Sequence, residues 1–144
     1  MYKRILVPLE NGPADGAILK HVSQLAKVHG SEVLLFHVAD GWAARNMEQL
    51  NLRESQEMKE DRAYLERMSE ELRQAGVKAE AVLAAGEPAK EIAAAAEREH
   101  VDLIAMATHG HSLLSDVMHG TTATALRHVS RIPILMVRVP AQEP

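Results

Sequence analysis

The sequence predicts an α/β domain built on a doubly wound, five-stranded parallel sheet with helices on both faces. Short apolar runs alternate with longer amphipathic runs along the chain, which is typical of β-α-β units. Four of the five short runs are near-continuous Ile, Leu, Val and Met, as expected for strands that are covered on both faces. The length of 144 residues fits one hydrophobic core, so we expect a single domain over residues 1–144.

Five runs are expected to form the strands, and right-handed crossovers between them favour the order 3-2-1-4-5. The third run is the weakest, because apolar residues alternate there with Lys78 and Glu80, which suits an edge strand with one wetter face. The expected strands are Arg4 to Pro8, Glu32 to Val38, Val77 to Leu83, Val101 to Ala107 and Pro133 to Val139.

Four helices are expected between these strands. The first begins near Pro13 and ends at Gly30, and the second runs from about Glu48 to Ala75. The third starts after residues 86–88, and the fourth spans about Thr121 to Ser130. Helical spacing places a set of apolar residues inward: Ile18, Val22, Leu25, Ala26, Met58, Leu65, Met68, Leu72, Ala125, Leu126 and Val129.

The second helix also carries a run of charged residues, which we interpret as a solvated outer face. This run consists of Glu54, Glu57, Lys59, Glu60, Asp61, Arg62, Glu66 and Arg67.

Composition excludes several classes of function. The chain has no cysteine, which rules out disulfides, thiol nucleophiles and cysteine-based metal sites. The net charge of −4 and the four aromatic residues argue against a nucleic-acid partner, which needs a basic surface or stacking platforms. The sequence has no apolar run long enough to insert into a membrane and no signal-peptide core, so we expect a cytoplasmic protein.

The loop after the fourth expected strand has the composition of an anion site. Gly110 is followed by nine residues and then by Gly120, Thr121 and Thr122, which open a helix. Free backbone N–H groups at a helix start favour phosphate, and a glycine lets the backbone approach it closely. Two such glycines are also common as ordinary turn and cap residues, so the interpretation depends on what lies opposite them.

The segment opposite this loop is Pro8, Leu9, Glu10 and Asn11, which leaves the first strand at the point where the strand order reverses. Ligands of doubly wound sheets bind at such a switch point. The Glu10 carboxylate offers acceptor oxygens for ribose hydroxyls. The alternative role for Glu10 and Asn11 is to cap the first helix.

These residues give the chain a resemblance to the universal stress protein family. The segments KRILVPLENGPADGAILKHV, EVLLFHVAD, GEPAKEIAAAAEREHVDLIAMATHG and HGTTATALRHVSRIPILMV carry it, across almost the whole chain. ATP-binding members of the family have G-x2-G-x9-G-[ST] in the loop, and this sequence reads A-x2-G-x9-G-T. The resemblance implies the Rossmann-like fold of the adenine nucleotide α-hydrolase-like proteins, and ATP or AMP as ligand.

By this resemblance, Gly110, Gly120 and Thr121 hold phosphates, Met106 and Ala107 line the sugar and base end, and Pro8 and Val38 flank adenine. The sequence departs from the family pattern at two of its site positions. Ala107 adds a methyl group where the family has glycine, and Glu10 is one methylene longer than the usual aspartate. Both changes affect affinity or orientation and leave the anion site in place.

The expected phosphate site contains no lysine or arginine between Ala107 and Ala125. His109, His111 and His119 are the residues there that can offset phosphate charge, so we expect Mg²⁺ to accompany the nucleotide and binding to weaken above the histidine pH range. A dedicated metal site at these histidines is the less favoured alternative, because no carboxylate completes a ligand set. The remaining histidines, His21, His29, His37, His100 and His128, are interpreted as surface or capping groups.

No recognisable catalytic motif accompanies the site, and Ser112, Ser115 and Asp116 have no evident base. We therefore expect a nucleotide-binding regulatory protein that acts through an unknown protein partner. The alternatives are a nucleotide-independent dimeric interaction module and a slow ATPase. The last strand is an apolar sheet edge, and both this feature and the family resemblance predict a homodimer paired through it.

Overall fold

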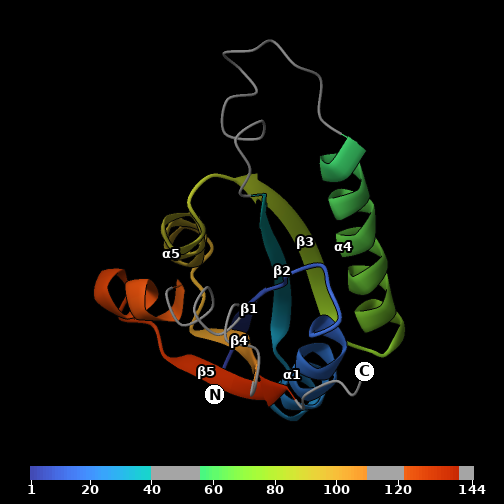
Figure 1. Ribbon diagram of the computed structural model, residues 1–144. Coiled ribbons are helices and arrows are strands. Elements are labelled where there is room, and N and C mark those ends of the chain that lie inside the picture. Colours follow the sequence, from blue (N-terminus) through green and yellow to red (C-terminus); the bar gives the residue numbers. More distant parts are fainter. Residues whose placement is uncertain (40–55, 110–121, 140–144) are drawn as a thin grey trace.

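The computed structural model describes residues 1–39, 56–109 and 122–139, and these form one five-stranded sheet. All strand pairs are parallel, in the order β3-β2-β1-β4-β5. The predicted doubly wound fold and its strand order are therefore confirmed. Figure 1 shows the sheet with helices on both sides. The strands are β1 (Arg4–Pro8), β2 (Glu32–Ala39), β3 (Lys78–Ala85), β4 (Leu103–His109) and β5 (Ile134–Val139).

Three strands begin later in the sequence than predicted. Val77 and Val101 use their N–H groups to close the preceding helices, donating to the carbonyl oxygens of Leu72 and Ala96 at 2.9 Å each. The strands β3 and β4 therefore begin one and two residues later and extend to Ala85 and His109. Pro133 precedes β5 because proline has no N–H group to donate to the ladder.

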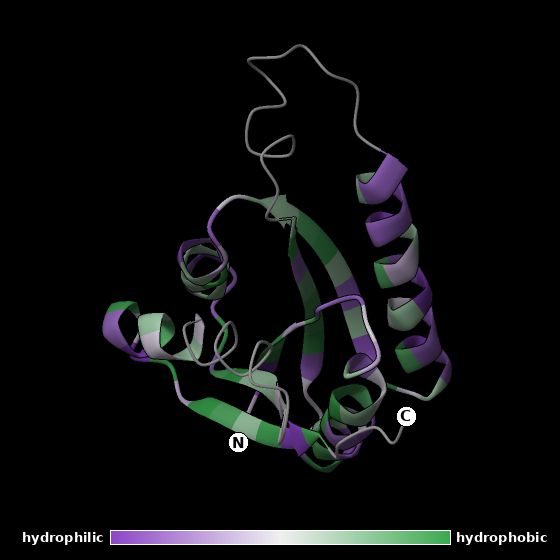
Figure 2. Cartoon of the chain, viewed as in Figure 1, coloured by the Kyte–Doolittle hydropathy of each residue, from purple (hydrophilic) through white to green (hydrophobic). Residues whose placement is uncertain are grey.

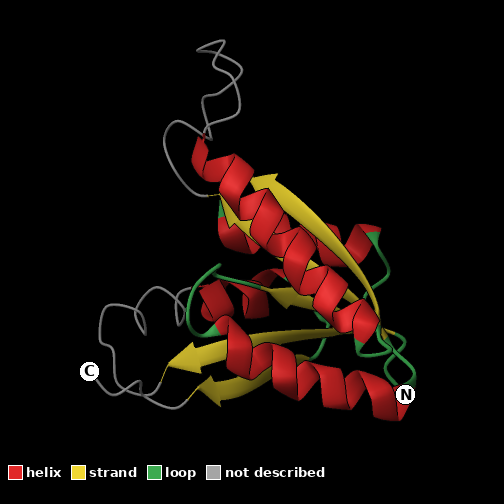
Figure 3. Ribbon diagram, turned by 90° about the vertical axis from the view of Figure 1, so that its right-hand side faces the viewer, coloured by secondary structure: helices red, strands yellow, loops and turns green. Residues whose placement is uncertain are grey.

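One face of the sheet is covered by α1 (Asp15–His29) and α4 (Gln56–Gln74), and Figure 3 looks onto this face. Ile18 and Val22 of α1 and Leu65 and Leu72 of α4 pack in one cluster with the β-strand residues that point to this side. The predicted apolar stripe of the second helix is confirmed within the described part of that helix. In Figure 2 the hydrophilic colour dominates the remainder of α4.

The opposite face is covered by α5 (Pro88–Arg98) and a helix over residues 122–129. Ile92 of α5 and Leu126 of the last helix pack with Phe36, which is among the largest fully buried side chains. The prediction that Val129 points inward is wrong, because its side chain is 62% exposed. Leu126 fills the core position of that helix turn, and Val129 lies at the last helical residue, beside the turn to β5.

The first helix begins at Asp15, two residues after Pro13, near which its start was expected. Residues 12–15 form a turn in which the Asp15 N–H donates to the Gly12 carbonyl at 3.1 Å, and Ala14 is the N-cap. The end of the helix is as predicted, because Gly30 adopts a left-handed φ of 68° and donates its N–H to Ala26. No helix in the described ranges is long and apolar enough to cross a membrane.

Candidate functional site

The candidate site lies where β1 and β4 leave the sheet. These neighbouring strands are paired at two positions, Ile5 with Leu103 and Leu6 with Ile104. By contrast, β1 remains paired with β2 as far as Pro8, and β4 with β5 as far as His109. The ladder between the two central strands thus ends before either strand does. The helices that follow β1 and β4 also cover opposite faces, so the switch point predicted from the sequence is present here.

The predicted residues of the first segment lie together at this switch point. Pro8 ends β1, and Leu9 is buried, with its N–H donating to the Phe36 carbonyl at 2.7 Å. Glu10 is half-buried, and its side-chain Oε1 has almost no solvent exposure. Val38 lies two residues beyond Phe36 on β2 and is also half-buried. Glu10 and Asn11 do not occupy the capping position of α1, because its N-cap residue is Ala14.

On the second segment, Met106 and Ala107 are both buried but belong to clusters on opposite faces of the sheet. His109 is the last residue of β4, and Thr122 is the first described residue of the last helix. Five predicted site residues lie outside the described residues: Gly110, His111, His119, Gly120 and Thr121. Their proposed contacts with phosphate therefore remain predictions.

A buried carboxylate holds the segment that leaves β1. Asp15 is 1% exposed, and its two oxygens accept hydrogen bonds from the N–H groups of Glu10 and Gly12, at 3.1 Å each. The Tyr64 hydroxyl, on α4, donates to the same carboxylate at 2.9 Å. Three donors from two parts of the chain thus converge on one side chain. This arrangement fixes the backbone of the loop from Leu9 to Gly12.

A second set of polar groups holds the same loop from its other side. His37 Nδ1 donates to the Leu9 carbonyl oxygen at 2.7 Å, and His37 Nε2 lies 3.6 Å from Asp61 Oδ2. The Asn11 amide donates to the Asp61 backbone carbonyl at 3.2 Å and to Asp61 Oδ1 at 3.1 Å. Asn11 has a left-handed φ of 57°, a conformation that asparagine tolerates better than most residues.

Two sequence interpretations are corrected by these contacts. His37 is not a surface or capping group, and Asp61 is not part of the solvated face of α4, because their side chains are 16% and 18% exposed and face each other. A signal for Asp61 was present in the sequence. It continues the buried stripe of Met58, Leu65 and Leu72 at helical spacing, so a carboxylate there needed a partner.

The ionisation of this cluster is set mainly by burial. Burial raises the pKa of Asp15, while the hydrogen bonds from Glu10, Tyr64 and Gly12 oppose that rise. Burial also raises the pKa of Tyr64, and its hydrogen bond to the nearby Asp15 carboxylate raises it further. Tyr64 is therefore a permanent hydrogen-bond donor to Asp15 at physiological pH.

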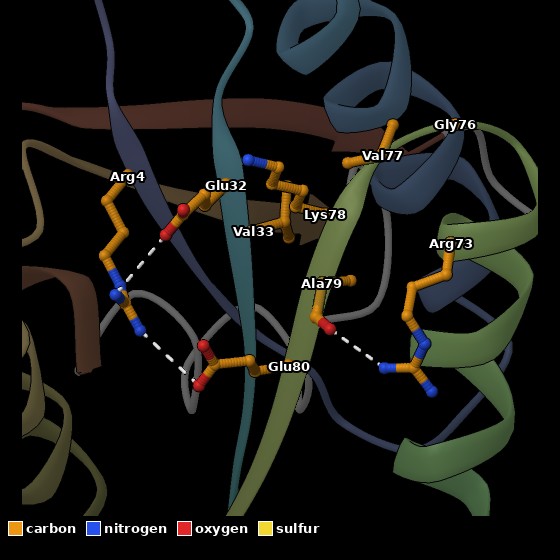
Figure 4. Close-up of a pocket in the computed structure, with 9 residues that line it drawn as sticks. All are labelled: Arg4, Glu32, Val33, Arg73, Gly76, Val77, Lys78, Ala79 and Glu80. Atoms are coloured by element: carbon orange, nitrogen blue, oxygen red, sulfur yellow. Dashed lines mark hydrogen bonds and ion pairs between the residues drawn. The ribbon is translucent and has the colours of Figure 1, made fainter.

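A separate cavity of about 430 Å³ lies at the amino ends of the strands (Figure 4). Its two arginines are already engaged. Arg4 lies 3.3–3.5 Å from the carboxylates of Glu32, Glu80 and Glu99. Arg73 donates to the Ala79 carbonyl at 2.9 Å and to Ser69 Oγ at 2.6 Å. Because both arginines bind protein groups, we interpret this cavity as structural. The switch point therefore remains the candidate site.

Within the described ranges, no group of three or more His, Asp or Glu side chains is placed to hold a metal ion. The fold and the candidate site together define a doubly wound α/β protein, the class of fold in which ligands bind at the switch point. The chain belongs to the universal stress protein family, whose model matches residues 1–138.

Individual relatives agree with this assignment. The universal stress protein MJ0577 of Methanocaldococcus jannaschii is 30% identical over 96% of this chain and 96% of its own length. The solved structure of MJ0577 has a TM-score of 0.78 at 29% identity and covers 100% of this chain and 99% of that chain.

Two more distant structures share the fold and were solved with nucleotides. A universal stress protein in complex with cAMP has a TM-score of 0.67 at 14% identity, with coverage of 94% of this chain and 96% of that chain. A universal stress protein from Archaeoglobus fulgidus in complex with dAMP has a TM-score of 0.70 at 18% identity, with coverage of 94% and 98%.

Proposed function

We propose that this chain binds an adenine nucleotide, AMP or ATP, at the carboxyl ends of β1 and β4, and that occupancy of this site regulates a protein partner. The observation that carries the proposal is the early end of the β1–β4 ladder, beside a loop that is fixed by Asp15 and His37. Membership in the universal stress protein family supports it. Two structural relatives were solved with the adenylates cAMP and dAMP, which adds further support.

The roles within the site follow the two segments. Pro8 and Val38 flank the base, Met106 and Ala107 line the sugar end, and Glu10 accepts hydrogen bonds from the ribose. Gly110, Gly120, Thr121 and Thr122 hold the phosphates with backbone and hydroxyl donors. His109, His111 and His119 supply positive charge at low pH, and Mg²⁺ accompanies ATP.

Two measurements on the purified wild-type chain test this function. Mass spectrometry of small molecules released by denaturation is expected to find an adenylate. Calorimetric titration of nucleotide-free protein is expected to show saturable binding of AMP and ATP, with ATP affinity strengthened by Mg²⁺ and weakened between pH 6 and 8.5. The nucleotide concentration is raised to about 1 mM, because a Kd of that size corresponds to a binding free energy of only about −4 kcal/mol. Absence of released adenylate together with absence of binding at that concentration would leave the nucleotide-independent module as the better account.

We also propose that the chain forms a homodimer through β5. This strand is at the edge of the sheet, so one row of its backbone groups has no partner strand among the described residues of the monomer. Met136 on β5 is 43% exposed and borders a groove of about 520 Å³ that Ile132 and Ile134 also line. A second copy would pair the open strand edge and cover these apolar side chains.

Replacing Met136 by lysine is expected to shift the dimer to monomer, because a two-fold interface carries the added charge twice. Light scattering at micromolar protein should report twice the 15.8 kDa chain mass for the wild type and one chain mass for Met136→Lys. Val129→Lys is the matched control, since it changes an exposed apolar residue outside β5 and should leave the dimer intact. A wild type that is monomeric at this concentration would exclude the dimer.

A further inference from the structure

Four polar side chains hold the loop at the candidate nucleotide site, and we call them the loop clamp: Asp15, His37, Asp61 and Tyr64. Two of them, Asp61 and Tyr64, lie on α4. The loop that they hold, residues 9–12, is the one that presents Glu10 at the switch point. The loop clamp thus joins an outer helix to the residues expected to contact the ribose.

Every residue of the loop is tied by at least one hydrogen bond. Leu9 is held at both its N–H and its carbonyl, by Phe36 and His37. The N–H groups of Glu10 and Gly12 are held by Asp15, and the Asn11 side chain is held by Asp61. Such a loop has little conformational freedom left to lose when a ligand binds.

We propose that α4 sets the affinity of the site for adenylate, with Tyr64 and Asp61 as positioning residues that hold residues 9–12 in the binding conformation. This inference rests on the proposed function. Tyr64 acts through Asp15, because its hydroxyl orients the carboxylate that receives the N–H groups of Glu10 and Gly12. Asp61 acts through Asn11 and His37, which fix the opposite side of the loop.

The contacts of α4 show that the positioning role of Tyr64 differs from the packing that attaches the helix to the sheet. The apolar side of the helix, with Leu65 and Leu72, already packs against the sheet. Toward its carboxyl end, Ser69 accepts a hydrogen bond from Arg73, which also binds the Ala79 carbonyl of β3. The Tyr64 hydroxyl is therefore not needed to attach the helix, and its hydrogen bond goes to the loop side of the structure.

Tyr64→Phe tests the inference because it removes one hydroxyl and keeps the ring. We expect its Kd for AMP, measured by calorimetry, to rise about 3- to 10-fold, the range that corresponds to one hydrogen bond. Ser69→Ala is the matched control, since it removes a buried hydroxyl from the same helix without touching the loop. The Kd of Ser69→Ala is expected to stay within about two-fold of the wild-type value, even if Ser69→Ala lowers the Tm as much as Tyr64→Phe does.

Amide hydrogen exchange without ligand gives a readout independent of binding. Exchange of the Glu10 and Gly12 amides should be faster in Tyr64→Phe and unchanged in Ser69→Ala, because Tyr64 donates to their acceptor Asp15 whereas Ser69 bonds to Arg73. AMP should in turn slow exchange around Tyr64 in the wild type, because coupling between two sites is reciprocal.

The outcomes distinguish this inference from the proposed function. A wild type that binds no adenylate would contradict the function itself. If the wild type binds AMP and Tyr64→Phe binds it with the same Kd, the inference about α4 would be contradicted and the proposed function would stand. Equal weakening in Tyr64→Phe and Ser69→Ala would attribute the effect to general loosening of α4, and this result would also overturn it.

Discussion

Gly120→Val is expected to lower adenylate affinity by about 10- to 100-fold. This range corresponds to the loss of one charge-assisted hydrogen bond, worth about 1.5–3 kcal/mol. In the family motif that this chain resembles, Gly120 precedes Thr121 at the phosphate position. A branched side chain there would occupy the space through which phosphate approaches the backbone N–H groups. Calorimetric titration with AMP and ATP measures the effect.

The control for this variant is Ala94→Val, which introduces the same side chain at an exposed position in the middle of α5. This position lies outside both segments of the candidate site, so the adenylate affinity of Ala94→Val should match that of the wild type. Thermal unfolding of both variants separates loss of binding from loss of folding. Full affinity in a folded Gly120→Val variant would remove Gly120 from the site.

The fold could be predicted from the sequence because each strand and helix has a strong local signal. Near-continuous apolar runs such as residues 33–36 specify strands buried on both faces, and the structure has Leu34, Leu35 and Phe36 at 0–1% exposure. Strand starts were less predictable. Val77 and Val101 are as apolar as strand residues, but their N–H groups complete helix ends, and no periodic pattern encodes that choice.

The arrangement of residues at the candidate site was predictable in part, and the limit was set by how far apart in the sequence the interacting residues are. The switch point follows from chain topology, so Pro8, Leu9 and Glu10 could be placed without knowing any side-chain contact. The loop clamp depends on contacts between residues 49 or 50 positions apart, such as Tyr64 with Asp15 and Asn11 with Asp61. Within a charged helix, residue type did not distinguish Asp61 from its solvated neighbours, and the signal lay in its helical spacing with Met58 and Leu65.

Asp15→Ala is expected to lower the free energy of unfolding by about 2–4 kcal/mol, because it leaves buried donors without an acceptor. The donors are the N–H groups of Glu10 and Gly12 and the Tyr64 hydroxyl. The loss is smaller than three separate hydrogen bonds, since removing the carboxylate also removes the cost of burying it. Urea denaturation at pH 7 measures this change, with Ser69→Ala as a control for loss of another buried polar side chain.

The pH dependence of the same residue has a defined sign. Because burial raises the pKa of Asp15 above its ordinary value of 3.8, the folded state binds this proton more tightly than the unfolded state does. The stability that comes from binding this proton is therefore fully present below pH 3.8 and is lost as the pH rises through the folded-state pKa of Asp15, whereas the hydrogen bonds that its carboxylate accepts remain at pH 7.

Asp15→Asn keeps the shape of the side chain and has no such proton. The free energy of unfolding of the wild type, relative to that of Asp15→Asn, should consequently increase as the pH is lowered from 7 toward 4. Urea denaturation of both proteins across this range measures the difference. A difference that stays constant or shrinks on acidification would mean that the hydrogen bonds from Glu10, Gly12 and Tyr64 outweigh the burial of the carboxylate.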